Sequence, residues 1–239
     1  VAVHAGDLDA VAGQVAAHYE RADQAAEAIP YLERAAGAAR RSYANQQAVG
    51  YLRRAIGLLP AAIIDKVQAA RLHEQLGDVL ALSGNHEQAR QAYQEAVSLA
   101  PSSDRLWHAR LQCQVADTWR SQHRYAEAGV AYDAAMRQLA PGPTGPDPKW
   151  WHAWLDVQLA RADMLYFQSR LSELAELCRG MERIVTAHGS IRQQASYYHV
   201  LVMLHNRQSR FRPSAEEVGH VARAVELARK TDDQPFIDA

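Results

Sequence analysis

The chain lacks an excess of either charge. Its 26 lysine and arginine residues face 27 aspartate and glutamate residues, which leaves a formal net charge of −1. A dedicated nucleic-acid or membrane-surface binder usually carries a basic excess, so we expect neither direct nucleic-acid binding nor membrane attachment. No apolar run approaches the roughly 18 residues that a membrane-spanning helix needs, and no secretory leader is visible. These absences favour a cytoplasmic protein.

Cysteines and catalytic motifs are also scarce. Cys113 and Cys178 are the only cysteines, and because they lack the spacing of a metal or redox site we expect two reduced thiols. The eleven histidines are scattered singly. The motifs G-x-x-x-x-G-K-[S/T], G-x-G-x-x-G and G-x-S-x-G are absent, and HEQLG at His73 lacks the second histidine of a zinc protease. We therefore expect no cofactor, no metal site and no enzymatic activity.

Strand-forming clusters are nearly absent, whereas good helix formers fill the chain. Apolar residues recur at spacings of three and four, which is the period of an amphipathic helix. The hydrophobic content of 48% is enough to bury a core. The sequence therefore predicts an all-α protein with about eleven helices, at 7–22, 24–42, 45–59, 64–83, 86–99, 104–122, 125–139, 149–168, 171–188, 190–208 and 214–230.

The sequence also repeats itself. QLGDVLALSGNHEQARQAYQEA (75–96) aligns with QVADTWRSQHRYAEAGVAYDAA (114–135) at an offset of 39 residues. Looser copies cover 15–35 and 161–181. The alignment pairs Gly77 with Ala116, Leu80 with Trp119, Ala89 with Ala128, Tyr93 with Tyr132 and Ala96 with Ala135; in the last copy Ala162 takes the glycine position, whereas Leu174 and Met181 replace small residues. Repeats of this kind predict stacked antiparallel helix pairs.

Two details of the helix packing follow from these copies. Small residues in the repeat let the two helices of a pair approach, while Leu80 and Tyr93 are expected to fill the space toward the next pair. The spacing between Ala28 and Ala48 is only 20 residues, so the helix at 24–42 is predicted to serve two neighbouring pairs.

The stretch LGDVLALSGNHEQARQAYQEAVSLAP (76–101) resembles the tetratricopeptide repeat. It carries the Leu-Gly step, the turn residue Gly84, and then Ala89, Tyr93, Ala96 and Pro101. The resemblance is strong at 70–101, good at 104–141, fair at 7–60 and weak at 149–230. It implies a right-handed superhelical solenoid of antiparallel helix pairs. We expect repeats at 1–141, a Pro/Gly-rich loop at 142–148 and degenerate repeats, continuous with the first, at 149–239.

A second resemblance concerns the ends of the chain. The segments at 11–60 (VAGQVAAHYERADQ…YLRRAIGLLP) and 209–233 (SRFRPSAEEVGHVARAVELARKTDD) resemble the helical repeat region of large bacterial signalling regulators. Those proteins join this region to a P-loop ATPase of the STAND or AAA type and to a transcription-activating or nucleotide-cyclase effector. The resemblance implies a sensor or interaction segment taken from a longer bacterial protein.

In this repeat architecture the first helix of each pair lines the concave face. The residue after the glycine position points into that groove and is an aspartate in three copies, Asp78, Asp117 and Asp163. The predicted partner-binding residues are Arg71, Glu74, Asp78, Arg110, Asp117, Arg120, Asp163, Tyr166 and Phe167.

The charge of these residues predicts the kind of partner. Repeats that clamp a C-terminal carboxylate resemble each other in having Asn and Lys or Arg there, so acids favour a protein or peptide segment of basic or mixed charge. The alternative is that the acids only solvate the face or pair with nearby arginines, worth about 0–1 kcal/mol.

Other functions stay open at this point. The chain could be a constitutive assembly adaptor, or a small-molecule or peptide receptor with a pocket around Trp150, Trp154, Tyr166 and Phe167. The same tryptophans, in KWWHAW, could equally form core. Self-association is also left open, and an enzyme ranks lowest.

Overall fold

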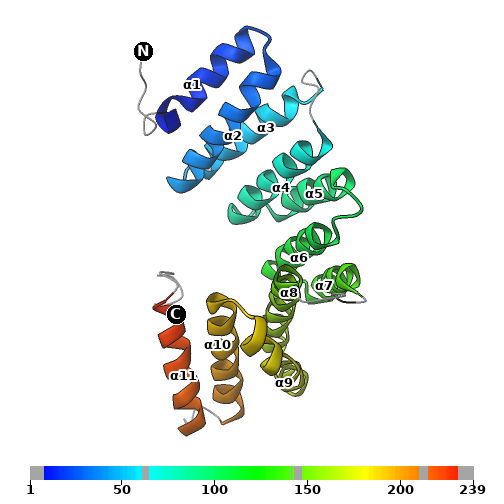
Figure 1. The fold of residues 1–239 in the computed structure, drawn as a ribbon, viewed down its shortest axis with the longest axis vertical. Coiled ribbons are helices and arrows are strands. Elements are labelled where there is room, and N and C mark those ends of the chain that lie inside the picture. The colour runs from blue at the N-terminus through cyan, green and yellow to red at the C-terminus, as the bar shows by residue number, and fades with distance from the viewer. Residues whose placement is uncertain (1–7, 61–64, 141, 143–146, 210–214, 231–239) are drawn as a thin grey trace. The chain divides into compact units, whose positions relative to one another are not determined.

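The computed structural model describes residues 8–60, 65–140, 142, 147–209 and 215–230 (Figure 1). Every predicted helix is present within these residues, with ends at most two residues from the expected positions, and they contain no strand. The helices are α1 (Leu8–Arg21), α2 (Ala25–Arg41), α3 (Asn45–Leu58), α4 (Lys66–Leu82), α5 (His86–Leu99), α6 (Arg105–Ser121), α7 (Tyr125–Leu139), α8 (Pro148–Phe167), α9 (Leu171–His188), α10 (Ile191–Gln208) and α11 (Ala215–Ala228). The all-α prediction is confirmed.

Side-chain caps explain where four of these helices begin. Asp65, Asp104 and Asp147 each accept a hydrogen bond from a backbone amide two or three residues further on. Ser190 and Gln193 form a reciprocal capping box at the start of α10. Such caps satisfy amides that have no partner inside the helix, typically worth about 1 kcal/mol each.

One turn geometry follows α1, α2, α4, α6 and α8. Each of these turns has a residue with positive φ, in chain order Asp23, Tyr43, Gly84, His123 and Ser169. In the α4–α5 turn the amide of Asn85 donates to the carbonyl of Leu80 at 2.9 Å, a bond that closes the helix end. Because the α2–α3 turn shares this geometry and α2 packs on both α1 and α3, α2 serves two pairs, as predicted.

The helices form two compact units, Val1–Gln122 and His123–Ala239. The first unit contains α1 to α6 and the second contains α7 to α11. Of the expected loop at 142–148, residues 143–146 lie outside the described residues. The expected division of the repeats at that loop therefore stays a prediction.

The glycine of the clearest repeat makes room for an aromatic ring. A Cβ atom added at Gly77 would lie 2.5 Å from Cε1 of Tyr93, so no side chain fits between α4 and that ring. We had expected the ring to fill the space toward the next pair. The ring packs against Gly77 inside its own pair, and Tyr93 also lines a pocket together with Gln114 and Asp117 of α6 in the next pair.

Candidate partner-binding groove

In the first unit, six of the predicted binding residues lie on α4 and α6. Glu74 forms a two-point ion pair with Arg110, with N–O distances of 2.9 and 3.0 Å. The indole Nε1 of Trp107 donates to the same carboxylate at 2.8 Å. Because Glu74 is buried, these bonds make it a structural link between α4 and α6.

Two arginines of the predicted set lie beside carboxylates. Arg120 pairs with Asp117 on its own helix, with an N–O distance of 3.4 Å. Arg71 is exposed and its charge acts on Glu33 of α2. Burial raises the pKa of Glu33 above its usual value, and hydrogen bonds from glutamine side chains and the Arg71 charge oppose that rise. The face therefore contains a partly dehydrated carboxylate besides those that were predicted.

Asp78 is held by two neighbours and keeps one oxygen available. The Tyr93 hydroxyl donates to its Oδ1 at 3.0 Å, and Nε2 of Gln114 donates to the same oxygen at 2.8 Å. Within the described part of the chain, Oδ2 accepts no hydrogen bond. Burial raises the pKa of Asp78 above its usual value, with the Tyr93 hydrogen bond as the main opposing effect.

Asp78 and Asp117 line the same pocket, which has a volume of about 370 Å³. Its apolar wall includes Ala81 and Leu82, and the Leu82 side chain is 68% exposed. The structure thus brings together two of the three aspartates that the sequence predicts. The other lining residues come from α2 (Arg40), α5 (His86 and Tyr93) and α6 (Gln114, Thr118 and Ser121).

The remaining predicted residues lie at the end of α8, in the second unit. Asp163 is half-buried. The Tyr166 ring lies 4.6 Å from the Arg207 guanidinium of α10 and makes an edge-to-face contact with Phe167. Phe167 is 56% exposed. Of the two aromatic residues, Phe167 is therefore the more accessible to a partner.

The aromatic residues of α8 occupy its two ends. Near its start, Trp151 makes edge-to-face contacts with Trp150 and Trp154 and stacks on His188, with ring centroids 4.8 Å apart in the stack. Tyr166 follows Trp154 by 12 residues on the same helix, a separation of about 18 Å. Trp154 and Tyr166 therefore lie too far apart along α8 for one small molecule to contact both.

Several groove residues escaped the sequence analysis. Gln75 and Gln114 occupy equal positions in the two best copies, and each donates to a carboxylate on an earlier helix, at 3.5 Å to Glu33 and 2.8 Å to Asp78. This repeated glutamine was a usable signal. Arg40 gave none, because it reaches the pocket from α2, which is far away in the sequence.

Arg90 was a further omission. Its guanidinium lies 3.4 Å from the centroid of the Trp119 ring and donates to Thr118 at 3.2 Å and to Gln122 at 2.8 Å. The sequence placed Trp119 in the core because it aligns with Leu80. In the structure Trp119 is half-buried, and the Arg90 guanidinium covers its ring.

Neither the helices nor the cysteines of the described residues point to another kind of site. Among the described residues, none of the helices combines the length and apolarity that crossing a membrane requires. In the same part of the chain, no three histidine, cysteine or acidic side chains are grouped to hold a metal ion. Both cysteines are free thiols, and burial raises the pKa of Cys178 to about 12, which makes it unreactive.

Known proteins share the repeat and the fold described above. Residues 70–103 match the family model of the tetratricopeptide repeat, and no curated protein matches the chain. The solved structure of BtubC (BKLC) from P. vanneervenii is similar over 97% of this chain and 94% of its own, with a TM-score of 0.70 and 11% identity. A Podospora anserina protein, described as a kinesin light chain with nearly identical TPR-like repeats, is similar over 95% and 98%, with a TM-score of 0.54 and 13% identity. The described part of the chain therefore has an all-α solenoid fold of the tetratricopeptide-repeat type, with one such repeat matched at residues 70–103.

Proposed function

We propose that the groove of the first unit is a non-catalytic binding site for a polypeptide segment of basic or mixed charge. The observation that carries this proposal is the pocket shared by Asp78 and Asp117, in which Oδ2 of Asp78 has no donor within the described residues. Next to it, Oε1 of Gln114 is buried and also accepts no hydrogen bond. A lysine or arginine head group carries the donors that these oxygens lack.

The balance of charge and apolar surface supports the same kind of partner. A cation relieves the cost of keeping the Asp78 carboxylate partly dehydrated, whereas an anion would face two aspartates. Ala81 and Leu82 offer apolar contact for the aliphatic stem of the incoming side chain. Arg40 supplies the positive charge that a segment of mixed charge would use.

A peptide-selection experiment tests this proposal. A randomised peptide library is panned against the protein, and the affinity of an enriched peptide is measured by calorimetry. We expect enrichment of lysine or arginine, and roughly 10- to 100-fold weaker binding to the Asp78→Asn/Asp117→Asn double variant, the effect of losing charge-assisted hydrogen bonds.

A matched control removes two charges elsewhere. Glu87 and Glu95 are exposed on α5 and do not line the pocket, so Glu87→Gln/Glu95→Gln changes the net charge equally and should keep full affinity. Selection of acidic peptides, or equal affinity of the two double variants, would refute the proposed groove.

We further propose that the chain acts in the cytoplasm as the sensor or interaction segment of a multidomain bacterial signalling regulator. The resemblance of 11–60 and 209–233 to such regulators supports this role, and the free cysteines are compatible with a reducing compartment. A sensor must bind one conformation of the array better than another. Small-angle scattering with and without a selected peptide should then differ, whereas identical curves at saturation would favour a constitutive adaptor.

A further inference from the structure

The repeats differ at the position of Arg90. Gly129 on α7 lies 39 positions after Arg90 and takes its place in the aligned copies. In the first unit the Arg90 side chain fills the space over Thr118 and Trp119. A Cβ atom added at Gly129 would meet nothing within 4 Å, so the corresponding space is open.

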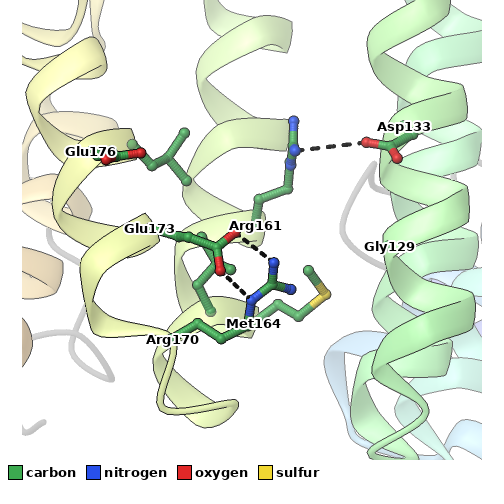
Figure 2. Close-up of a pocket in the computed structure, with 9 residues that line it drawn as sticks. Gly129, Asp133, Arg161, Met164, Arg170, Glu173 and Glu176 are labelled. Atoms are coloured by element: carbon green, nitrogen blue, oxygen red, sulfur yellow. Dashed lines mark hydrogen bonds and ion pairs between the residues drawn. The ribbon is translucent and has the colours of Figure 1, made fainter.

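That open space is part of a pocket of about 390 Å³ in the second unit (Figure 2). Met164 and Leu165 are buried in its wall, at the aligned positions of Thr118 and Trp119. Leu177 adds a third apolar side chain from α9. The pocket therefore has an apolar lining at the positions where, in the first unit, Arg90 packs over Thr118 and the Trp119 ring.

Charged residues from α7, α8, α9 and the turn before α9 surround this lining. Arg161 of α8 reaches Asp133 on α7 at 3.6 Å, and Arg170 forms a two-point pair with Glu173 at 2.5 and 2.7 Å, as Figure 2 shows. Glu176 makes no hydrogen bond or ion pair within the described residues. The pocket thus holds three carboxylates and two guanidinium groups, and its unbalanced charge is negative.

We propose that this pocket receives the guanidinium group of an arginine side chain from a partner polypeptide. The neighbouring repeat shows that an arginine fits the equivalent space, where Arg90 is buried. The incoming stem packs on Met164, Leu165 and Leu177, and its head group bonds to Glu176. This second site is independent of the groove at Asp78.

In the proposed complex Glu176 of α9 accepts the hydrogen bond of the guanidinium, as Gln122 does for Arg90 in the first unit. Arg90 donates to Gln122, but the aligned Gln168 already accepts a hydrogen bond from Arg170 at 3.2 Å. The guanidinium of a partner must therefore find its acceptor on α9. Its planar fork suits a carboxylate better than the ammonium group of a lysine does.

The direct test uses a small probe and the amide of Gly129 as a reporter. Nα-acetyl-L-arginine amide is titrated into the isotope-labelled protein, with the neutral Nα-acetyl-L-citrulline amide as the matched control. We expect a saturable NMR shift at Gly129 with the arginine probe alone. Absence of saturation, or an equal response to the citrulline probe, would overturn the proposal.

Variants then place the probe. Gly129→Arg supplies the missing side chain from within the protein and should abolish binding, whereas Gly129→Ala should keep it, because its Cβ meets no atom. Glu176→Gln should weaken binding roughly tenfold, the effect of losing one charge-assisted hydrogen bond. For the two variants of Gly129 the reporter is the neighbouring amide of Val130. Circular dichroism confirms that each variant folds, and unchanged binding by Gly129→Arg would also refute the site.

Discussion

The pairs α4–α5 and α8–α9 fill the space between their two helices in different ways, because large and small residues exchange places at the aligned positions. The first pair sets a large ring, Tyr93, against Gly77 and keeps alanines at 89 and 96. The second has a small thiol, Cys178, in the tyrosine position, with larger residues in the alanine positions. All of its aligned residues are buried: Ala162, Leu174, Cys178 and Met181.

The two pairs therefore keep a similar filled volume between their helices, although the individual residues differ. This difference also explains why only residues 70–103 match the repeat model, although the likeness of fold extends over 97% of the chain. Exchanging side chains between the two pairs tests whether each depends on its own way of filling this space.

The largest effect is expected from Leu174→Ala, which gives the second pair the small residue of the first without its ring. Leu174 is fully buried, so the change should lower the free energy of unfolding by about 2–5 kcal/mol. Urea denaturation measures this loss. Leu82→Ala is the control and should cost little, since that side chain is exposed. A loss below about 1 kcal/mol at Leu174 would mean that the two pairs do not pack as described.

A smaller effect, of opposite sign in two backgrounds, is expected at Gly77. Gly77→Ala gains up to about 1 kcal/mol of helix propensity but forces the Tyr93 ring to move, at a cost of about 1–3 kcal/mol. The single variant should thus be less stable than the parent. In a Tyr93→Cys background, which copies the second pair, the same substitution should stabilise. Equal effects in both backgrounds would show that the ring is not what excludes a side chain at 77.

The smallest effect is expected in the turns. Gly84 adopts its positive φ freely, whereas Ser169 holds the same conformation with a side chain, which disfavours it by about 1–2 kcal/mol. The Ser169 hydroxyl also accepts a hydrogen bond from Arg207 at 3.0 Å, so the comparison is made in an Arg207→Ala background. In that background Ser169→Gly should stabilise by about 0.5 kcal/mol after the entropy of the added glycine is subtracted. Thermal unfolding measures the shift, and a lower midpoint than that of the parent would contradict this explanation.

The sequence predicts what depends on local pattern. The helices follow from apolar spacing, and the α4–α5 turn follows from Gly84 and Asn85. Their places in the fold require only neighbouring residues. That Asp78 and Asp117 line one pocket was also predictable, because both follow the glycine position of aligned copies.

Contacts between distant side chains were not predictable in the same way. Arg90 on Trp119 and Arg40 at the groove depend on which helices become neighbours, and no periodicity encodes the reach of an arginine. The aromatic residues of α8 misled for a related reason. Trp154 and Tyr166 are both aromatic and only 12 residues apart in the sequence, but the rise of α8 separates them by about 18 Å.

The most direct measurement is the pKa of Asp78 with and without a bound basic peptide, followed by carboxyl-carbon NMR and assigned with Asp78→Asn. Burial holds this pKa above its usual value in the free protein. A cation beside the carboxylate favours its charged form, so binding should lower the pKa, and by linkage affinity should fall as pH drops through it. Our account predicts that decrease at saturation. An Asp78 pKa unchanged by saturating peptide would contradict it.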